Sequence, residues 1–196
     1  MILCFDTETT GLTNSREPPE HPSQPHLVQL AAILYDDAGE RELATLALIV
    51  RPDGWEIPAQ AAAVHGITTE LATAAGVPLV VALAAFNHLA RAATTHVAHN
   101  AEFDMVVMGA AFHRVGRPQH PLNPRCTKNL ATPVLNLPPT DRMRAAGFIK
   151  PKPPTLAECY KFFFNEELVG AHDALVDTRG CARVYFELMR RATVPA

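Results

Sequence analysis

The sequence predicts an α/β fold in which a mixed sheet of five strands carries helices on both faces. Apolar, strand-like runs come first in the chain, and short strands then alternate with helical stretches. This order is typical of a mixed sheet rather than of a sandwich or a helical bundle. With 196 residues, of which 48% are hydrophobic, we expect a single domain over residues 1–196.

The expected strands are short apolar runs bounded by turn-forming residues. The first strand ends in a pair of carboxylates, and the polar connection 37–40 predicts a hairpin between the second and the third. The fifth is expected to be a short strand at the edge of the sheet. The five ranges are 2–8, 26–36, 42–50, 95–100 and 121–127.

Helices are expected where apolar residues recur at helical spacing. The expected ranges are 58–68, 68–76, 77–92, 101–116, 155–164 and 171–191. Two proline-rich stretches, 13–25 and 137–154, are expected to be loops, and their length indicates a functional or mobile role.

The composition excludes several classes of protein. No run of 18 apolar residues could span a membrane, and the start of the chain lacks the basic region of a signal peptide. The cysteines Cys4, Cys126, Cys159 and Cys181 are scattered, and no pair has the spacing of a metal site. We therefore expect reduced thiols in the core of a cytoplasmic protein.

Charge is distributed unevenly along the chain. The net charge is −3, but residues 114–161 hold nine Lys and Arg against two acidic residues, so this segment is +7 and the rest −10. Such a segment permits an anionic partner, for example a nucleic acid. A solvated basic face explains the same observation equally well.

The first strand ends in two carboxylates, Asp6 and Glu8, that are expected to share one face of the sheet. Alternate residues of a strand point the same way, so both should follow Ile2 and Cys4. They lie at the carboxyl end of the strand, where open α/β sheets usually place their ligands.

Two helices are expected to direct further carboxylates inward. Asp104 precedes Val107 and Met108 of one apolar stripe, and Asp177 follows Ala174 by one turn on another. A cap or a salt bridge would explain any one of these carboxylates. Four together need a counter-charge, and these elements offer no inward Lys or Arg.

A divalent cation is the better counter-charge for the four carboxylates. Oxygen ligands favour Mg²⁺ or Mn²⁺ over zinc. His172 precedes Asp177 by five positions, and beside such a cluster it becomes a candidate general base. Considered alone, His172 would be interpreted as a surface histidine.

Three segments resemble the motifs of the DnaQ-like 3′–5′ exonucleases, in the subgroup with four acidic residues and a histidine. They are FDTETTGL, HNAEFD and AHDALVDT, in the order of the family and with its His-x4-Asp spacing. Residues 63–68, AVHGIT, resemble a substrate-side segment of bacterial proofreading exonucleases. The sibling subgroup carries Tyr four residues before the final Asp, where this chain has Asp173. The resemblance spans residue 2 to about residue 190.

The resemblance implies a ribonuclease-H-like fold and the release of 5′-mononucleotides from DNA. It implies that Asp6, Glu8 and Asp177 hold two divalent ions, Mg²⁺ or Mn²⁺. Asp104 would assist directly or through water, and His172 would take a proton from the attacking water. Two such ions activate the nucleophile and stabilise the leaving 3′ oxygen. Single-stranded 3′ ends are the preferred substrate, because the end must reach a small recessed cluster.

Five further positions are expected to contact substrate, and three of them have a plainer alternative. Thr9 lies in the turn after the first strand, and Leu12 would pack against the terminal base. His65 would contact the terminal nucleotide, or merely end a helix at the surface. Phe103 would stack on a base or belong to the core. Asn100 would cap the following helix or bind substrate, and capping is the preferred interpretation.

Two regions outside the motifs are also expected to serve the substrate. Lys128, Lys150 and Lys152 would grip phosphates, although general solubility explains them equally well. The loop 13–25 follows directly on the first strand, so we expect it to border the active-site cleft.

Two other functions are compatible with the sequence. An exoribonuclease of the same family would differ only in contacts near the sugar 2′ position. A non-catalytic nucleic-acid-binding or polymerase-accessory module could use the same fold, but all five acidic and histidine positions are filled. A polymerase partner in proofreading would be a separate protein.

Overall fold

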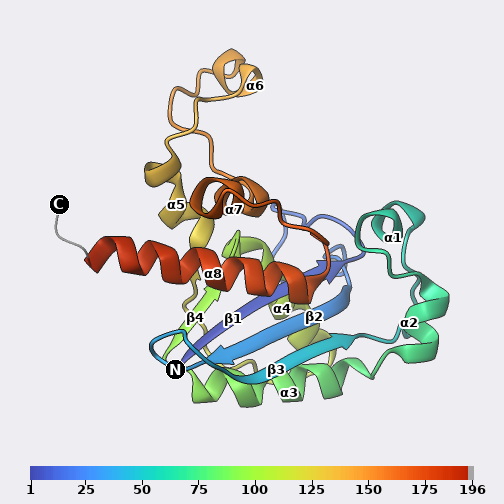
Figure 1. Ribbon diagram of the computed structural model, residues 1–196. Coiled ribbons are helices and arrows are strands. Elements are labelled where there is room, and N and C mark those ends of the chain that lie inside the picture. Colours follow the sequence, from blue (N-terminus) through green and yellow to red (C-terminus); the bar gives the residue numbers. More distant parts are fainter. Residues whose placement is uncertain (194–196) are drawn as a thin grey trace.

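The computed structural model describes residues 1–193 and centres on one five-stranded sheet (Figure 1). The strand order is β3-β2-β1-β4-β5, with antiparallel pairing from β1 to β3 and parallel pairing of β1 with β4 and of β4 with β5. The strands are β1 Ile2–Thr9, β2 Leu27–Tyr35, β3 Glu42–Ile49, β4 Thr95–Ala98 and β5 Arg125–Cys126. The predicted mixed sheet, its hairpin and its short edge strand are confirmed.

Several helices begin or end at residues with recognisable capping chemistry. Thr155 and Glu158 form a reciprocal capping box at the start of α7, and Gly66 ends α1 in the left-handed region. The bounds are α1 Ala59–His65, α2 Thr69–Ala75, α3 Leu79–Ala92, α4 Ala101–Arg114, α5 Thr127–Leu135, α6 Asp141–Ala145, α7 Leu156–Phe164 and α8 Ala174–Thr193.

Helices cover both faces of the sheet. On one face, Ile2, Cys4 and Ile33 are buried beneath α8, with α5 and α7 packed beside it. On the other face, α3 and α4 cover Leu3 and Phe5. Because β1 alternates between the two cores, its carboxyl end can present side chains to both.

Two helices were not predicted from the sequence. Pro133 lies inside α5, where it disguises the helical pattern, but Ala131 and Leu135 still bury the helix against the α8 side of the core. Helix α6 lies within the stretch predicted to be a loop. It has no buried residue, so no apolar stripe marks it, and its start is capped by Thr140.

The two proline-rich stretches differ in how they are held. In the first, the side chain of Gln24 is 2% exposed and donates hydrogen bonds to three main-chain carbonyls of the same loop. Arg114 of α4 donates to the carbonyl of Pro25 at 2.7 Å. In the second, the N–H of Lys152 donates to the carbonyl of Leu137 at 2.9 Å and closes the base of an excursion. We call residues 137–152 the arm, which projects from the body with α6 at its tip (Figure 1).

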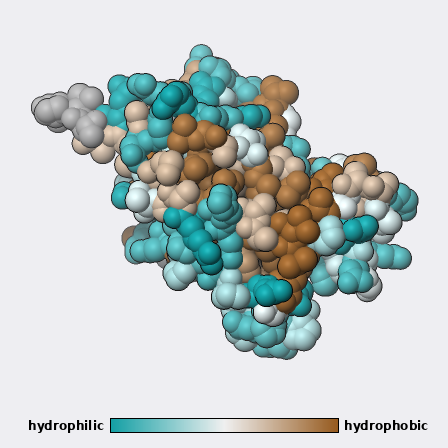
Figure 2. Space-filling view, turned by 90° about the horizontal axis from the view of Figure 1, so that it is seen from below, coloured by the Kyte–Doolittle hydropathy of each residue, from teal (hydrophilic) through white to brown (hydrophobic). Residues whose placement is uncertain are grey.

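The outer surface has both apolar and polar regions. Figure 2 shows the face that carries α3, where apolar side chains form a band, and Val80 and Val81 of this helix are 41% and 49% exposed.

None of the described helices combines the length and the apolar character that crossing a bilayer requires. All four cysteines are free thiols; three are buried and Cys126 is half-buried.

Candidate active site

The end of β1 presents Asp6 and Glu8 on the same face of the sheet. Ile2 and Cys4 precede them on this face and are buried in the core beneath α8, whereas the two carboxylates are half-buried. Glu8 lies opposite Gln29 of β2 in the antiparallel register. The shared face expected from strand alternation is therefore confirmed.

Asp104 approaches the same edge of the sheet from α4. It is 2% exposed, and its Oδ1 accepts a hydrogen bond from the hydroxyl of Thr7 at 2.8 Å. Val107 and Met108 continue the same stripe and are fully buried. The inward orientation of Asp104 is confirmed, and Thr7 fixes one of its oxygens.

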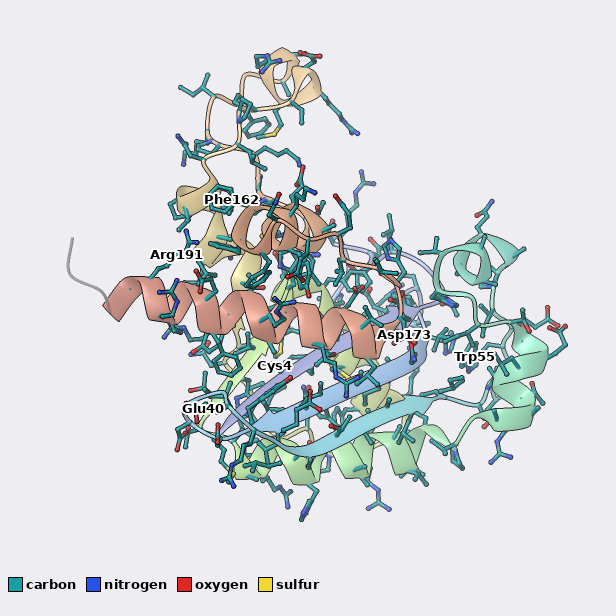
Figure 3. All side chains as sticks on the ribbon, in the orientation of Figure 1. Cys4, Glu40, Trp55, Phe162, Asp173 and Arg191 are labelled. Atoms are coloured by element: carbon teal, nitrogen blue, oxygen red, sulfur yellow. The ribbon has the colours of Figure 1, made fainter. Side chains whose placement is uncertain are left out.

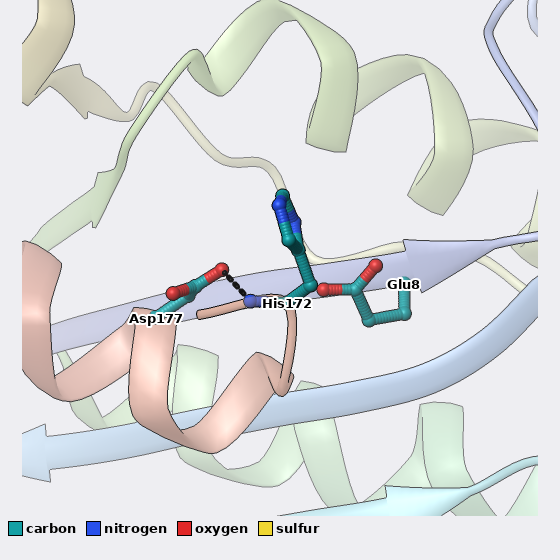
Figure 4. Close-up of side chains that lie close together, drawn as sticks. All are labelled: Glu8, His172 and Asp177. Carbon is teal, nitrogen blue, oxygen red and sulfur yellow. Dashed lines mark hydrogen bonds between the residues drawn. The ribbon is translucent and has the colours of Figure 1, made fainter. Parts of the chain in front are cut away.

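The start of α8 supplies Asp177 and His172. Asp177 lies in the first turn of the helix, and its Oδ2 accepts a hydrogen bond from the main-chain N–H of His172 at 3.0 Å (Figure 4). His172 precedes the helix, with an exposed side chain and φ of 70°. Potential ligand atoms of Glu8, His172 and Asp177 all lie within 4.8 Å of one another.

Burial raises the pKa of all four carboxylates, and within residues 1–193 no Lys or Arg lies among them. Burial is the main cause for Asp6, whose pKa rises well above its usual range, and the other three carboxylates add to it. The pKa of Glu8 rises to about 8, chiefly through burial and then through Asp177 and Asp104. Burial also raises the pKa of Asp104 and of Asp177. Within residues 1–193, no Lys or Arg offsets these shifts.

The residues present fit a divalent metal ion. Oδ1 of Asp177 is buried and has no hydrogen-bond partner in the described part of the chain. An orphaned acceptor of this kind is expected for an atom reserved for a ligand. Carboxylate oxygens are the donors that Mg²⁺ and Mn²⁺ prefer, and the imidazole of His172 adds a nitrogen nearby.

A pocket of about 470 Å³ adjoins the carboxylates through Glu8. Four of the five residues predicted to contact substrate line it: Thr9, Leu12, His65 and Phe103. Leu12 is 89% exposed, so an apolar side chain faces solvent beside the pocket. The structure thus brings these residues together, and their roles in substrate binding stay a prediction.

His65 and Phe103 each had a predicted contact with substrate and a plainer structural alternative. Nδ1 of His65 accepts a hydrogen bond from the N–H of Ile67 at 3.1 Å, while its Nε2 is buried without a partner among the described residues. Burial lowers the pKa of His65, which favours the neutral imidazole. Phe103 packs against the core and also lines the pocket.

Asn100 corrects the sequence interpretation. It lies at the N-cap of α4, but its main chain is left-handed, with φ of 67°, and its side chain makes no capping hydrogen bond. A capping side chain normally requires extended backbone at this position. Oδ1 of Asn100 instead accepts a hydrogen bond from Nζ of Lys128. The prediction of a side-chain cap is wrong, and Asn100 does not line the pocket.

The lysines predicted to grip phosphates differ in their environment. Nζ of Lys128 donates to Asn100, and Lys152 forms an ion pair with Glu158. Lys150 of the arm is exposed and forms no ion pair within residues 1–193. Lys150 is therefore the most available of the three.

The loop 13–25 borders a different hollow of about 960 Å³. Glu20 and Pro22 of the loop line it, and so do His26 and Trp55, whose rings stack with centroids 4.6 Å apart. None of the four carboxylates lines this hollow, and the loop does not line the pocket beside Glu8.

Gln29 and Asp173 contact the site and were missed in the sequence. Asp173 is the half-buried residue directly before α8 (Figure 3), and Gln29 is 7% exposed within an otherwise apolar strand. The sequence signal that could have indicated Gln29 was a polar residue in the apolar run LVQLAAILY, near the end of the hairpin that carries the carboxylates. Only the register shows that Gln29 lies opposite Glu8.

Solved structures of exonucleases share this fold. E. coli exonuclease I in complex with a dT13 oligonucleotide matches with a TM-score of 0.76 and 21% identity, over 97% of this chain and 41% of that one. Exonuclease X in complex with 5′ overhanging duplex DNA matches with a TM-score of 0.62 and 23% identity, over 100% and 95%. A zinc-bound E. coli exonuclease I–ssDNA complex matches with a TM-score of 0.72 and 20% identity, over 97% and 40%. This chain thus spans about two fifths of exonuclease I.

The sequence also matches a family model over nearly its whole length. A search of curated proteins finds no match to this sequence. The exonuclease family model, RNase_T, matches residues 3–185, a range that contains all four carboxylates and His172. Because this match covers far more than half of the chain, the chain belongs to the RNase_T exonuclease family, the DnaQ-like group of the ribonuclease-H-like superfamily.

Proposed function

We propose that this chain is a metal-dependent 3′–5′ exonuclease that releases 5′-mononucleotides from DNA, preferably from single-stranded 3′ ends. The observation that carries the proposal is the convergence of four carboxylates and a histidine at one edge of the sheet, with no Lys or Arg among them within residues 1–193. Family membership supports phosphodiester hydrolysis. The oligonucleotide bound to E. coli exonuclease I supports DNA as the substrate class.

Asp6, Glu8 and Asp177 would hold two divalent ions, Mg²⁺ or Mn²⁺, with Asp104 assisting directly or through water. Bound ions of this kind supply the charge that activates the attacking water and stabilises the leaving 3′ oxygen. The orphaned Oδ1 of Asp177 is available as a ligand. Thr7 holds Asp104 in place, so that this carboxylate is oriented before any ion binds.

His172 would act as the general base. A nitrogen of its imidazole lies within 4.8 Å of carboxylate oxygens of Glu8 and Asp177, where the attacking water would be held. The side chain is exposed, so the proton that it takes can pass to solvent.

The pocket beside Glu8 would receive the 3′-terminal nucleotide. Leu12 and Phe103 offer apolar surface for a base, and His65 places an imidazole in the wall of the same pocket. A pocket of about 470 Å³ suits a ligand of nucleotide size. An unpaired end enters such a pocket without the cost of separating a base pair, which favours single-stranded substrate.

The test uses 5′-labelled single-stranded DNA, duplex DNA and RNA, each with Mg²⁺, Mn²⁺ or chelator. We expect a ladder that shortens from the 3′ end of DNA, that disappears in chelator and that forms far more slowly in His172→Ala. His88→Ala is the matched control, because His88 is exposed on α3 and lines neither the pocket nor the acidic cluster. Faster cleavage of RNA would favour an exoribonuclease. Binding without nucleotide release from any substrate would contradict the proposal and favour a non-catalytic module.

A further inference from the structure

We propose that Gln29 is a positioning residue for His172 and acts through Asp173. This inference rests on the proposed function, because it assigns Gln29 to the placement of the general base. Gln29 comes from β2, whereas His172 and Asp173 lie in the turn before α8. The inference therefore concerns a cross-link between the sheet and that turn.

Both ends of the Gln29 amide are used in this link. Nε2 donates to Oδ2 of Asp173 at 3.2 Å, and Oε1 accepts from the N–H of Ala174 at 3.0 Å. The two bonds reach consecutive residues, so they fix both the position and the orientation of the chain there. Gln29 is 7% exposed, and water competes little for these bonds.

Asp173 connects this link to the helix. Its other oxygen, Oδ1, accepts hydrogen bonds from the N–H groups of Leu175 and Val176 at 2.9 and 3.1 Å. The carbonyl of Asp173 accepts from the N–H of Asp177 at 2.9 Å. Asp173 thus caps α8 and spans Gln29 and the first helical turn.

His172 depends on its main chain for its position. Its imidazole makes no hydrogen bond to any residue within 1–193, whereas its N–H donates to Asp177. Its φ of 70° lies in the left-handed region, which is unfavourable for a residue with a Cβ. The hydrogen bond from its own N–H to Asp177 holds this conformation directly, and the bonds of Gln29 to Asp173 and Ala174 fix the chain immediately after it.

The plainer role for this link is to cap and stabilise α8. The two roles differ in what they predict for the chemical step. If the role is purely structural, removing the link lowers the free energy of unfolding and leaves kcat of the folded enzyme unchanged. If the role is positioning, removing the link lowers kcat, because a small displacement of a catalytic group reduces the rate even when the fold persists.

The decisive variants exchange donor and acceptor across the link. Gln29→Leu removes both bonds without adding charge, and Gln29→Glu places two carboxylates against each other. Asp173→Asn sets two amide groups against each other. The double variant Gln29→Glu/Asp173→Asn restores the pairing in reverse, because the amide introduced on the turn can donate to the carboxylate introduced on β2 while its oxygen still caps α8. The control Leu34→Val lies at the far end of β2 in the opposite core and tests destabilisation alone.

Steady-state rates on single-stranded DNA with saturating metal should separate the roles. We expect Gln29→Leu and Gln29→Glu to lower kcat about 10- to 100-fold with KM changed less than about threefold. The double variant should recover most of kcat, and Leu34→Val should retain it. In a His172→Ala background, Gln29→Leu should change the residual rate less than about twofold, because its effect passes through His172.

Any of three results would overturn the inference while the proposed function stands. One is an active wild type whose kcat is unchanged by Gln29→Leu in protein shown to be folded. The second is a double variant that stays as slow as Gln29→Leu. The third is a Gln29→Leu effect that persists at full size without His172. An inactive wild type, by contrast, would be a failure of the proposed function itself.

Discussion

The two ends of α8 carry carboxylates in opposite environments. Asp177, in the first turn, has one oxygen without a protein partner among the described residues, and burial raises its pKa. Glu187, nearer the C-terminus, receives hydrogen bonds from Arg190 and Arg191, which lower its pKa to about 2. The same helix therefore holds one acid matched to a protein cation and one that is not. A carboxylate without a matching protein cation, rather than the mere presence of acids, therefore marks the site.

Substitution of these two acids should have very different effects on the rate of nucleotide release. Asp177→Asn removes a proposed ligand, which is worth several kcal/mol of transition-state stabilisation, and we expect the rate to fall about 1,000-fold. Glu187→Gln on the same helix should change kcat less than about twofold, because such a surface ion pair contributes to stability alone. Release of labelled nucleotide under excess metal measures both. Equal losses in the two variants would remove the distinction between the two ends.

The elements of the site could be predicted from local patterns, whereas their meeting in one site was predicted only through the family resemblance. Strand alternation placed Asp6 and Glu8 on one face, and helical spacing directed Asp104 inward. Gln29 was missed because its role depends on β1–β2 register and on a turn 144 residues later. These long-range pairings are set by packing of the whole chain, which no short window of sequence contains.

The errors also have local physical causes. Asn100 has a residue type and position that suit a cap, but its left-handed backbone directs the side chain to Lys128 instead. Helix α5 was hidden by Pro133, and α6 by its lack of any buried residue. Where burial and propensity agreed, as in α3 and α4, the predicted helices are confirmed.

Metal binding should stabilise the unmatched end of α8. A ligand at about 100 times its dissociation constant contributes about 2.7 kcal/mol, which corresponds to a rise in Tm of about 5–10 °C for a chain of this size. We expect Mn²⁺ to produce this rise in the wild type and in Glu187→Gln, and a much smaller rise in Asp177→Asn. Thermal unfolding by circular dichroism, with chelator as the reference, provides the measurement. A full rise in Asp177→Asn would place the metal elsewhere.

The pH dependence of stability should have opposite signs for Glu8 and Glu187. The folded-state pKa of Glu8 is raised from 4.5 to about 8, so its contribution to stability is present below pH 4.5 and is lost as the pH rises through 8. In chelator at about pH 8.5, Glu8→Gln should therefore raise Tm by at least about 4 °C, with little effect near pH 4.5. Glu187 has a lowered pKa, so its contribution is present above pH 4.5 and is lost toward pH 2.

Glu187→Gln should accordingly lower Tm near pH 7 by about 2–4 °C, an effect that shrinks below pH 4.5. Unfolding curves of both variants and the wild type across about pH 3 to 8.5 test the pair of slopes. Slopes of the same sign would show that the acids at the site and those matched to arginine do not differ electrostatically.

The contrast between paired and unpaired charges also applies to two lysines of the arm, where we expect a small effect on the salt dependence of binding. Lys152 is matched by Glu158, whereas Lys150 is exposed and unpaired among residues 1–193. Each phosphate contact to single-stranded nucleic acid contributes about 0.7 to the slope of log K against log salt concentration. Lys150→Ala should make this slope shallower by up to about 0.7, and Lys152→Ala by clearly less. Fluorescence anisotropy of a labelled oligonucleotide with Ca²⁺ in place of Mg²⁺ measures binding. An unchanged slope in both variants would mean that these lysines of the arm do not contact phosphate. Unpaired charge would then indicate a functional role for the carboxylate cluster but not for the arm.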